Sequence, residues 1–190
     1  MFVIALSGKQ RSGKSELAAA LSRNLVIPVV ACADSIKEEF LAKHPEVSST
    51  QLEDQKHLYR QELIDIGSEK RIFRSEYWIE RVLVEAAHKD RHRIVIVPDM
   101  RLRAEYEYVK TCFPNLTVRL SVPHEILQVR AGGNLTCEDD PTECELDDHL
   151  IPWDLRLDNS DRSRFYENIK TVEERLKFIL LKRMNQAQLA

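Results

Sequence analysis

Residues 8–15 read Gly8-Lys9-Gln10-Arg11-Ser12-Gly13-Lys14-Ser15, and this stretch decides the fold. It matches the phosphate-binding loop pattern Gly-x-x-x-x-Gly-Lys-Ser/Thr at every fixed position. An apolar run, Phe2–Leu6, precedes the loop, and a helix-like run, Glu16–Leu21, follows it. This strand–loop–helix context predicts that the loop binds the phosphates of a nucleoside triphosphate.

The residue types in the loop predict how it would hold its ligand. Gly8 and Gly13 allow the backbone to curl so that successive N–H groups point at phosphate oxygens. The Lys14 side chain is expected to reach the β- and γ-phosphates, and the Ser15 hydroxyl is expected to bind Mg²⁺. All eight residues of the loop are therefore candidate nucleotide contacts.

Length and charge restrict the class of protein. The chain has 190 residues and a net charge of −3, with acids and bases interspersed. We expect one domain over residues 1–190, with no nucleic-acid-binding face and no membrane span. The four cysteines form no C-x-x-C pair, which favours a reduced, cytoplasmic protein over a disulfide or zinc protein. The scattered histidines receive no catalytic role.

The alternation of short apolar runs with helix-like segments predicts an α/β three-layer sandwich with a five-stranded parallel sheet. The expected strands are Phe2–Leu6, Val26–Cys32, His92–Pro98, Leu116–Val122 and Trp153–Asp158. The expected helices follow the loop to about residue 24 and cover about residues 36–43, 51–71, 76–87, 102–111, 124–130 and 165–184.

Residues 131–148 show no periodicity and carry seven acidic side chains. A segment this long without regular structure is typical of a mobile lid in a compact domain. We expect most of these acids to stay in solvent, with some meeting cations when the lid closes. Arg130, which precedes the segment, is a candidate catalytic residue.

Polar residues at the ends of the later strands are candidates for chemistry, because parallel sheets bind ligands at the carboxyl ends of their strands. Asp99 follows the third expected strand and is a candidate Mg²⁺ ligand, directly or through water. Arg101 could hold an acceptor phosphate or neutralise the transferring group. Arg119 lies inside the fourth expected strand, where a buried arginine requires an anion unless the strand is at an edge.

Cations on the helix expected at residues 51–71 suggest a second anionic substrate. Lys56, Arg60, Gly67 and Arg71 would share one face if this helix is continuous. Arginines on one face, with a glycine leaving room beside them, suit a phosphorylated acceptor. A solvated face paired with neighbouring acids explains the same pattern equally well. Lys37, just after the second expected strand, has the same standing.

Several stretches in the same order resemble the animal-type phosphomevalonate kinases, which belong to the P-loop nucleoside-monophosphate-kinase superfamily. The resemblance spans nearly the whole chain. The matching stretches are Ser7–Lys14, Asp34–Glu38, Tyr59-Arg60, Gly67–Arg71, Asp99–Arg101, Thr117–Arg119, Glu138–Asp140, Thr142–Asp147, Trp153 and Asp158-Asn159. The Gly-x-Glu-Lys-Arg and Thr-Glu-Cys-x-Leu-Asp stretches are the specific part of it.

The resemblance implies a kinase-like fold and a known reaction: ATP- and Mg²⁺-dependent conversion of 5-phosphomevalonate to 5-diphosphomevalonate in isoprenoid synthesis. The enzyme would be a monomer or weak homodimer acting on a small phosphorylated molecule. By the same resemblance, the residues serving ATP would be Lys9, Arg11, Lys14 and Arg130, with Asn159 near the adenine. Those holding phosphomevalonate would be Lys37, Arg60, Arg71 and Arg101.

The chain departs from this family at three positions, and these departures keep a second acceptor open. Ser15 stands where the family usually has Asp, Gln10 where it has Arg, and Leu102 where it has a second arginine. Viral deoxynucleoside monophosphate kinases carry a similar Asp-x-Arg-x-x-x-Glu stretch, matched here by Asp99–Glu105. A nucleoside monophosphate is therefore the alternative acceptor. A nucleotide-binding switch without kinase activity is a distant alternative, because no guanine-reading Asn-Lys-x-Asp segment is present.

Overall fold

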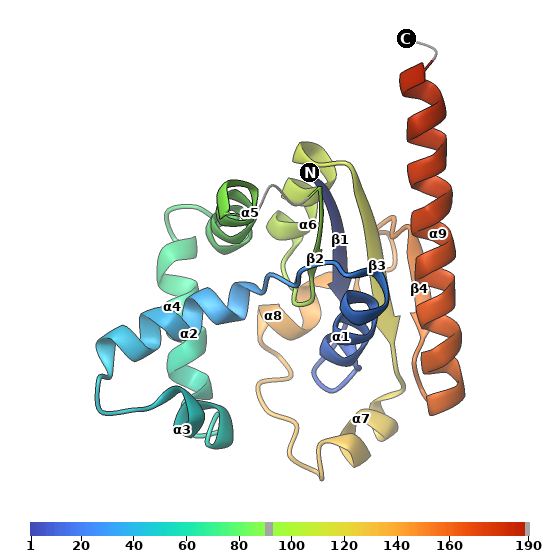
Figure 1. The fold of residues 1–190 in the computed structure, drawn as a ribbon. Helices are drawn as coiled ribbons and strands as arrows, with labels where there is room; N and C mark the ends of the chain where they lie inside the picture. The colour runs from blue at the N-terminus through green and yellow to red at the C-terminus, as the bar shows by residue number, and fades with distance from the viewer. Residues whose placement is uncertain (90–92, 189–190) are drawn as a thin grey trace.

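A computed structural model describes residues 1–89 and 93–188 of the chain (Figure 1). The sheet of these residues has four parallel strands: β1 (Phe2–Ser7), β2 (Ile94–Val97), β3 (Asn115–Ser121) and β4 (Leu155–Asp158). Their order is β2-β1-β3-β4, so β1, which leads into the phosphate loop, is an inner strand. Ile4 of β1 pairs with Ile96 on one side and Leu116 on the other.

Helices cover both faces of the sheet and make three layers (Figure 1). Alternate side chains of β1 point to opposite faces. Ile4 and Leu6 pack in a cluster with residues of α1 (Lys14–Leu25) and α9 (Arg162–Gln188). Val3 and Ala5 pack in a second cluster with residues of α2 (Cys32–Lys43), α4 (Arg60–Arg71), α5 (Tyr77–Lys89) and α6 (Arg103–Cys112). The predicted three-layer α/β sandwich with a parallel sheet is confirmed.

The shorter elements surround the carboxyl ends of the strands. They are α3 (Ser49–Asp54), α7 (His124–Arg130), α8 (Pro141–Cys144) and the 3₁₀ turn η1 (Glu145–Asp147). The α8 and η1 turns lie within the segment 131–148, where the sequence showed no periodicity. Along the described part of the chain, no helix has the length and apolarity that crossing a bilayer requires.

The second of the five predicted strands, Val26–Cys32, is wrong, and the sheet has four strands. Only Val29 makes a parallel bridge, to Ile96 at the edge of β2. Pro28 lacks an N–H group to donate to a ladder, and its carbonyl accepts from the Ile96 N–H at 2.9 Å. The chain enters α2 already at Cys32. The apolar run is thus a short extended connection against the sheet edge. The start of the next predicted strand, His92, lies outside the described residues.

The predicted continuous helix over residues 51–71 is also wrong, because it is two helices, α3 and α4. Ser48 caps α3 by accepting from the Gln51 N–H at 3.1 Å, and Gln55 ends that helix. The chain then turns, with the Leu58 N–H donating to the Gln55 carbonyl at 2.8 Å. Residues 55–59 contain neither Gly nor Pro, so the composition gave no sign of the break.

Candidate active site

The phosphate loop joins β1 to α1 and depends on both of its glycines. Gly8 and Gly13 adopt φ angles of 154° and 92°, a region that side chains rarely enter. A Cβ on Gly13 would lie 2.4 Å from Nδ2 of Asn159, and one on Gly8 would lie 2.8 Å from the Leu120 carbonyl oxygen. Asn159 is buried and donates from Nδ2 to the Ser12 carbonyl at 2.8 Å. Asn159 therefore packs against the loop and holds its backbone at Ser12 and Gly13.

Lys14 folds back onto its own loop. Its Nζ donates to the carbonyls of Gly8 at 2.6 Å and Lys9 at 2.7 Å. Burial, together with the nearby cations Arg101 and Arg119, lowers the pKa of Lys14 from 10.5 to about 7, while the negative charge of Glu143 opposes this shift. A phosphate that drew this ammonium away from the carbonyls would also favour its protonated form.

The predicted magnesium residues differ in their surroundings. Ser15 is exposed in the first turn of α1, where a hydroxyl can reach a phosphate-bound cation. Asp99 is half-buried, and its carboxylate accepts from the backbone N–H groups of Cys32 at 3.1 Å and Ala33 at 2.7 Å. Burial raises the pKa of Asp99, and the two amides work against that rise. Asp99 thus caps the first turn of α2. Within residues 1–89 and 93–188, no three His, Cys, Asp or Glu side chains form a metal cluster.

A cationic pocket of about 690 Å³, including solvent at its mouth, opens beside the loop. One part of its wall is apolar and another is positively charged. The apolar part comprises Cys32, Ala33, Ile36, Leu63 and Ile64. The cations are Lys37, Lys56, Arg60, Arg71 and Arg101, and the remaining lining residues are Asp99, Thr142 and Glu143. Four of the cations predicted to hold an acceptor, Lys37, Arg60, Arg71 and Arg101, therefore meet in one place with Lys56, although Lys56 lies in the turn before α4. The fifth, Arg119, is not among the residues that line the pocket.

A buried carboxylate, Glu105, organises two of these arginines. It accepts from the backbone N–H groups of Arg101 at 2.8 Å and Leu102 at 3.1 Å, and from Nη2 of Arg71 at 3.1 Å. Burial raises the pKa of Glu105, and Arg71 opposes the rise. Arg71 passes close over Gly67, where an added Cβ would lie 3.1 Å from its Nη1. The predicted space beside Gly67 is thus taken by Arg71 itself.

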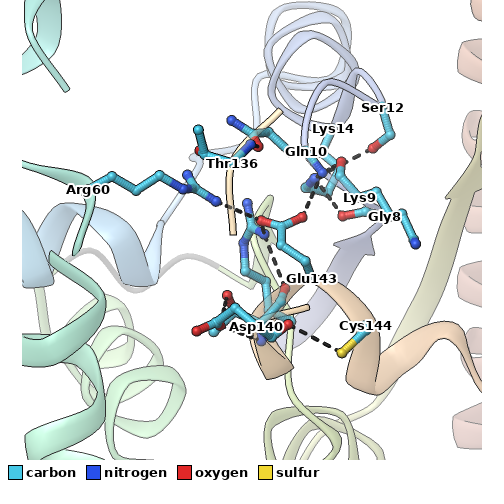
Figure 2. A network of polar contacts seen from close by, with 12 residues as sticks. Gly8, Lys9, Gln10, Ser12, Lys14, Arg60, Thr136, Asp140, Glu143 and Cys144 are labelled. Carbon is cyan, nitrogen blue, oxygen red and sulfur yellow. Dashed lines mark hydrogen bonds and ion pairs between the residues drawn. The ribbon is translucent and has the colours of Figure 1, made fainter. Parts of the chain in front are cut away.

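Two acids of the segment 131–148 reach into the site, as Figure 2 shows for Glu143. Glu143 is buried and accepts from the Gln10 N–H at 2.8 Å, from Arg60 at 3.1 Å and from Arg101. Asp147 pairs with Lys9 at 2.9 Å and with Arg119. The expectation that acids of this segment meet cations is confirmed for these two. The expectation of solvent is wrong for Glu143.

Two further candidate arginines, Arg119 and Arg130, also have partners within the chain. Arg119 lies on the inner strand β3, is buried, and donates to the Ser7 hydroxyl at 2.8 Å as well as to Asp147. The sequence left open whether it met an anion, and it does. Arg130 donates to the carbonyls of Asn159 at 2.8 Å and Ser160 at 3.0 Å.

Lys37 is likewise engaged, with Glu53 at 2.6 Å and Asp34 at 3.0 Å. Although Lys37 lines the pocket, its ammonium group is thus shared with acids from α2 and α3.

Comparison with known proteins places this site in a family. The family model for phosphomevalonate kinase matches residues 6–115, which include the phosphate loop and most of the cationic pocket. The chain belongs to the phosphomevalonate kinase family. A phosphomevalonate kinase from Drosophila melanogaster is 27% identical over 170 residues, covering 85% of this chain and 89% of the relative. The chain is therefore a phosphotransferase of the ATP-dependent kinase type.

Solved structures agree on the fold of this phosphomevalonate kinase family member. Shikimate kinase from Aquifex aeolicus has a TM-score of 0.53 at 22% identity, covering 94% of this chain and 98% of its own. The APS kinase CysC from Mycobacterium tuberculosis has a TM-score of 0.55 at 19% identity, with coverages of 92% and 96%. At these identities the likeness supports the P-loop kinase fold alone.

Proposed function

We propose that this chain transfers the γ-phosphoryl group of ATP to the phosphate of 5-phosphomevalonate, producing ADP and 5-diphosphomevalonate. The observation that carries the proposal is the junction of loop and pocket at Glu143. One carboxylate touches both the Gln10 N–H of the loop and Arg60 of the pocket. Phosphoryl transfer needs the donor and acceptor phosphates to be held next to each other and in line, and a side chain that touches both sites supports the conclusion that the sites adjoin.

The chemistry of the pocket wall supports an aliphatic acceptor. Phosphomevalonate carries a phosphate and a carboxylate on a branched carbon chain, which suits a wall of cations and small aliphatic side chains. Of the described residues that line the pocket, none is aromatic. A nucleobase binds best where an aromatic side chain offers a stacking face. The family model and the Drosophila relative, both named for phosphomevalonate, point the same way.

Each candidate residue has a role in this proposal. Gly8 to Ser15 would hold the triphosphate, with Asn159 behind the loop and near the adenine. Lys14, Arg101 and Arg130 would neutralise charge on the transferring group. Lys37, Arg60, Arg71, Arg101 and Arg119 would hold and orient the acceptor, directly or through neighbours. The acceptor phosphate is already an anion, so positioning and charge neutralisation carry the rate more than a general base does.

Magnesium fits the residues that the loop presents. Ser15 is exposed at the start of α1, and the Gln10 N–H already binds a carboxylate oxygen, so the loop accepts oxyanions. Ser15, with Asp99 acting through water, would hold Mg²⁺, which would supply further neutralisation of phosphate charge. We also propose a single domain over residues 1–190, with a lid at about 131–148. It would work in the cytoplasm as a monomer or weak homodimer, in keeping with four free cysteines.

A coupled assay of ADP release tests the proposal. Purified protein with ATP and Mg²⁺ is offered 5-phosphomevalonate and, in parallel, each ribonucleoside and deoxyribonucleoside monophosphate. We expect turnover with phosphomevalonate alone. Turnover with a nucleotide and none with phosphomevalonate would replace this acceptor by the nucleoside monophosphate alternative.

A further inference from the structure

Glu143 contacts groups that belong to two different substrate sites (Figure 2). On the nucleotide side, one carboxylate oxygen accepts from the Gln10 N–H at 2.8 Å. On the acceptor side, the other accepts from Arg60 at 3.1 Å and from Arg101. A backbone N–H in a phosphate loop and a pair of arginines are both typical phosphate ligands. The carboxylate therefore uses donors that each substrate phosphate requires.

The side chain is held there by the segment around it. Asp140 caps α8 by accepting from the Thr142 N–H at 2.9 Å, and Arg101 donates to the Thr142 carbonyl at 3.1 Å. Leu146, three residues beyond Glu143, is 2% exposed and belongs to the apolar cluster under α2 and α5. The Glu143 side chain is itself 4% exposed. These contacts and the burial of the side chain hold the Glu143 carboxylate against its donors.

Electrostatic repulsion prevents Glu143 and a substrate phosphate from occupying the same donors together. A carboxylate and a phosphate cannot share one N–H donor, and like charges a few ångströms apart repel strongly where water is excluded. Either substrate must therefore displace Glu143 from its own donors. Once one substrate has moved the carboxylate, the donors of the other site are also vacant.

We propose that Glu143 is a positioning residue that couples the two sites. Its carboxylate is an internal counter-ion that the first substrate displaces, so the second substrate binds without having to displace it. Nucleotide and acceptor then each increase the affinity of the other, and by linkage the two increases are equal. The coupling rests on the proposed function in requiring a nucleotide at the loop and an acceptor phosphate in the pocket.

Nucleotide binding without an acceptor provides the first test. Titration calorimetry with the Mg²⁺ complex of the non-hydrolysable analogue AMPPNP compares the wild type with Glu143→Gln. An amide makes a weaker hydrogen bond than a carboxylate and carries no charge, so the variant should bind the analogue about tenfold more tightly, about 1.4 kcal/mol. Glu145→Gln is the matched control, since Glu145 is an exposed acid of the adjoining turn η1. It should change the affinity less than about twofold. Equal or weaker binding by Glu143→Gln overturns the proposal.

The second test measures the coupling itself, and its decisive measurement is made on the wild type, so it does not depend on the folding of a variant. In the wild type, saturating 5-phosphomevalonate should tighten AMPPNP binding at least about fivefold, the lower end of usual coupling. In Glu143→Gln the same addition should change it less than about twofold. Absence of coupling in the wild type overturns the inference. Failure of the wild type to bind AMPPNP at all would instead overturn the proposed function, so the two failures are distinguishable.

Discussion

Replacing Arg71 by methionine separates two roles of that side chain, in binding the acceptor and in neutralising a buried acid. Arg71 lines the pocket, and its Nη2 lies 3.1 Å from Oε1 of Glu105. The two side chains are 15% and 1% exposed, so water screens the pair little. Methionine fills a similar volume without the charge. We expect Arg71→Met to lose both acceptor affinity and folding stability.

The magnitudes follow from burial. Removing one partner of a buried ion pair costs about 3–5 kcal/mol, because the other charge is left without compensation. Glu105 is already a carboxyl whose pKa burial raises, so it would take up a proton in the variant and recover part of that cost. We therefore expect a loss of about 2–4 kcal/mol in the free energy of unfolding. Loss of a charged hydrogen bond to the acceptor phosphate should lower kcat/KM for the acceptor by roughly 10- to 150-fold, since such bonds contribute about 1.5–3 kcal/mol.

The double variant Arg71→Met/Glu105→Gln is the control that divides the two effects. A glutamine keeps an oxygen for the N–H groups of Arg101 and Leu102, which Glu105 accepts at 2.8 and 3.1 Å. It carries no charge, so urea unfolding should show most of the lost stability restored. Steady-state kinetics should still show the acceptor defect, with the KM for ATP within about threefold of the wild type. If the double variant regains acceptor kcat/KM together with stability, Arg71 serves only the fold, and our acceptor site is wrong.

Three further outcomes follow from single residues. Val26 caps the C-terminus of α1 with a φ of 54°, which is a costly conformation for a β-branched side chain, and the side chain is 89% exposed. Urea melts of Val26→Gly should therefore show a free energy of unfolding about 1 kcal/mol higher than that of the wild type. The pKa of Lys14 is lowered to about 7, so the free protein holds this lysine mostly neutral at pH 8, and nucleotide phosphate should restore its charge. Nucleotide affinity should then fall by up to about tenfold per pH unit above pH 7, and calorimetry in two buffers at pH 8 should show uptake of about one proton. Asn159→Asp removes the donor to the Ser12 carbonyl and should weaken AMPPNP binding about tenfold, whereas unchanged affinity would show that the loop needs no support there.

The sequence predicted the parts of this molecule that local patterns determine. The loop needs glycines at two strained positions, and a strand and a helix beside it, all visible within residues 2–21. The predicted strand Val26–Cys32 is absent because an apolar run does not reveal whether a neighbouring strand will pair with it. Here Pro28 and the early start of α2 leave a single bridge at Val29. The sequence did not predict the break between α3 and α4 at residues 55–59, because the helical periodicity of apolar residues continues across it.

The sequence predicted the individual cations of the pocket, but it did not predict which acid pairs with each of them. Arginines near a phosphate loop suggest an anionic substrate from residue type alone, so Arg60, Arg71 and Arg101 were found. The roles of Glu105 and Asp147 depend on contacts between residues 28 to 138 positions apart, which no spacing encodes. The one available signal was the Thr142–Asp147 stretch, which combines acids with the buried Leu146. An apolar residue inside an acidic loop suggests that the loop packs against the protein.

The pairing of these cations changes what substrate binding means energetically. Arg60 and Arg101 meet Glu143, Arg71 meets Glu105, and Lys9 and Arg119 meet Asp147. Without such partners, this many positive charges in one partly buried site would destabilise the folded chain through repulsion and desolvation. Substrate binding therefore exchanges one anion for another and does not neutralise free positive charge. The net affinity for phosphate is lower than the attraction alone would give, because the internal acid must be displaced. Discrimination follows from the same exchange, because a weakly charged or badly placed ligand cannot compete with Glu143, whereas two phosphates bound together can.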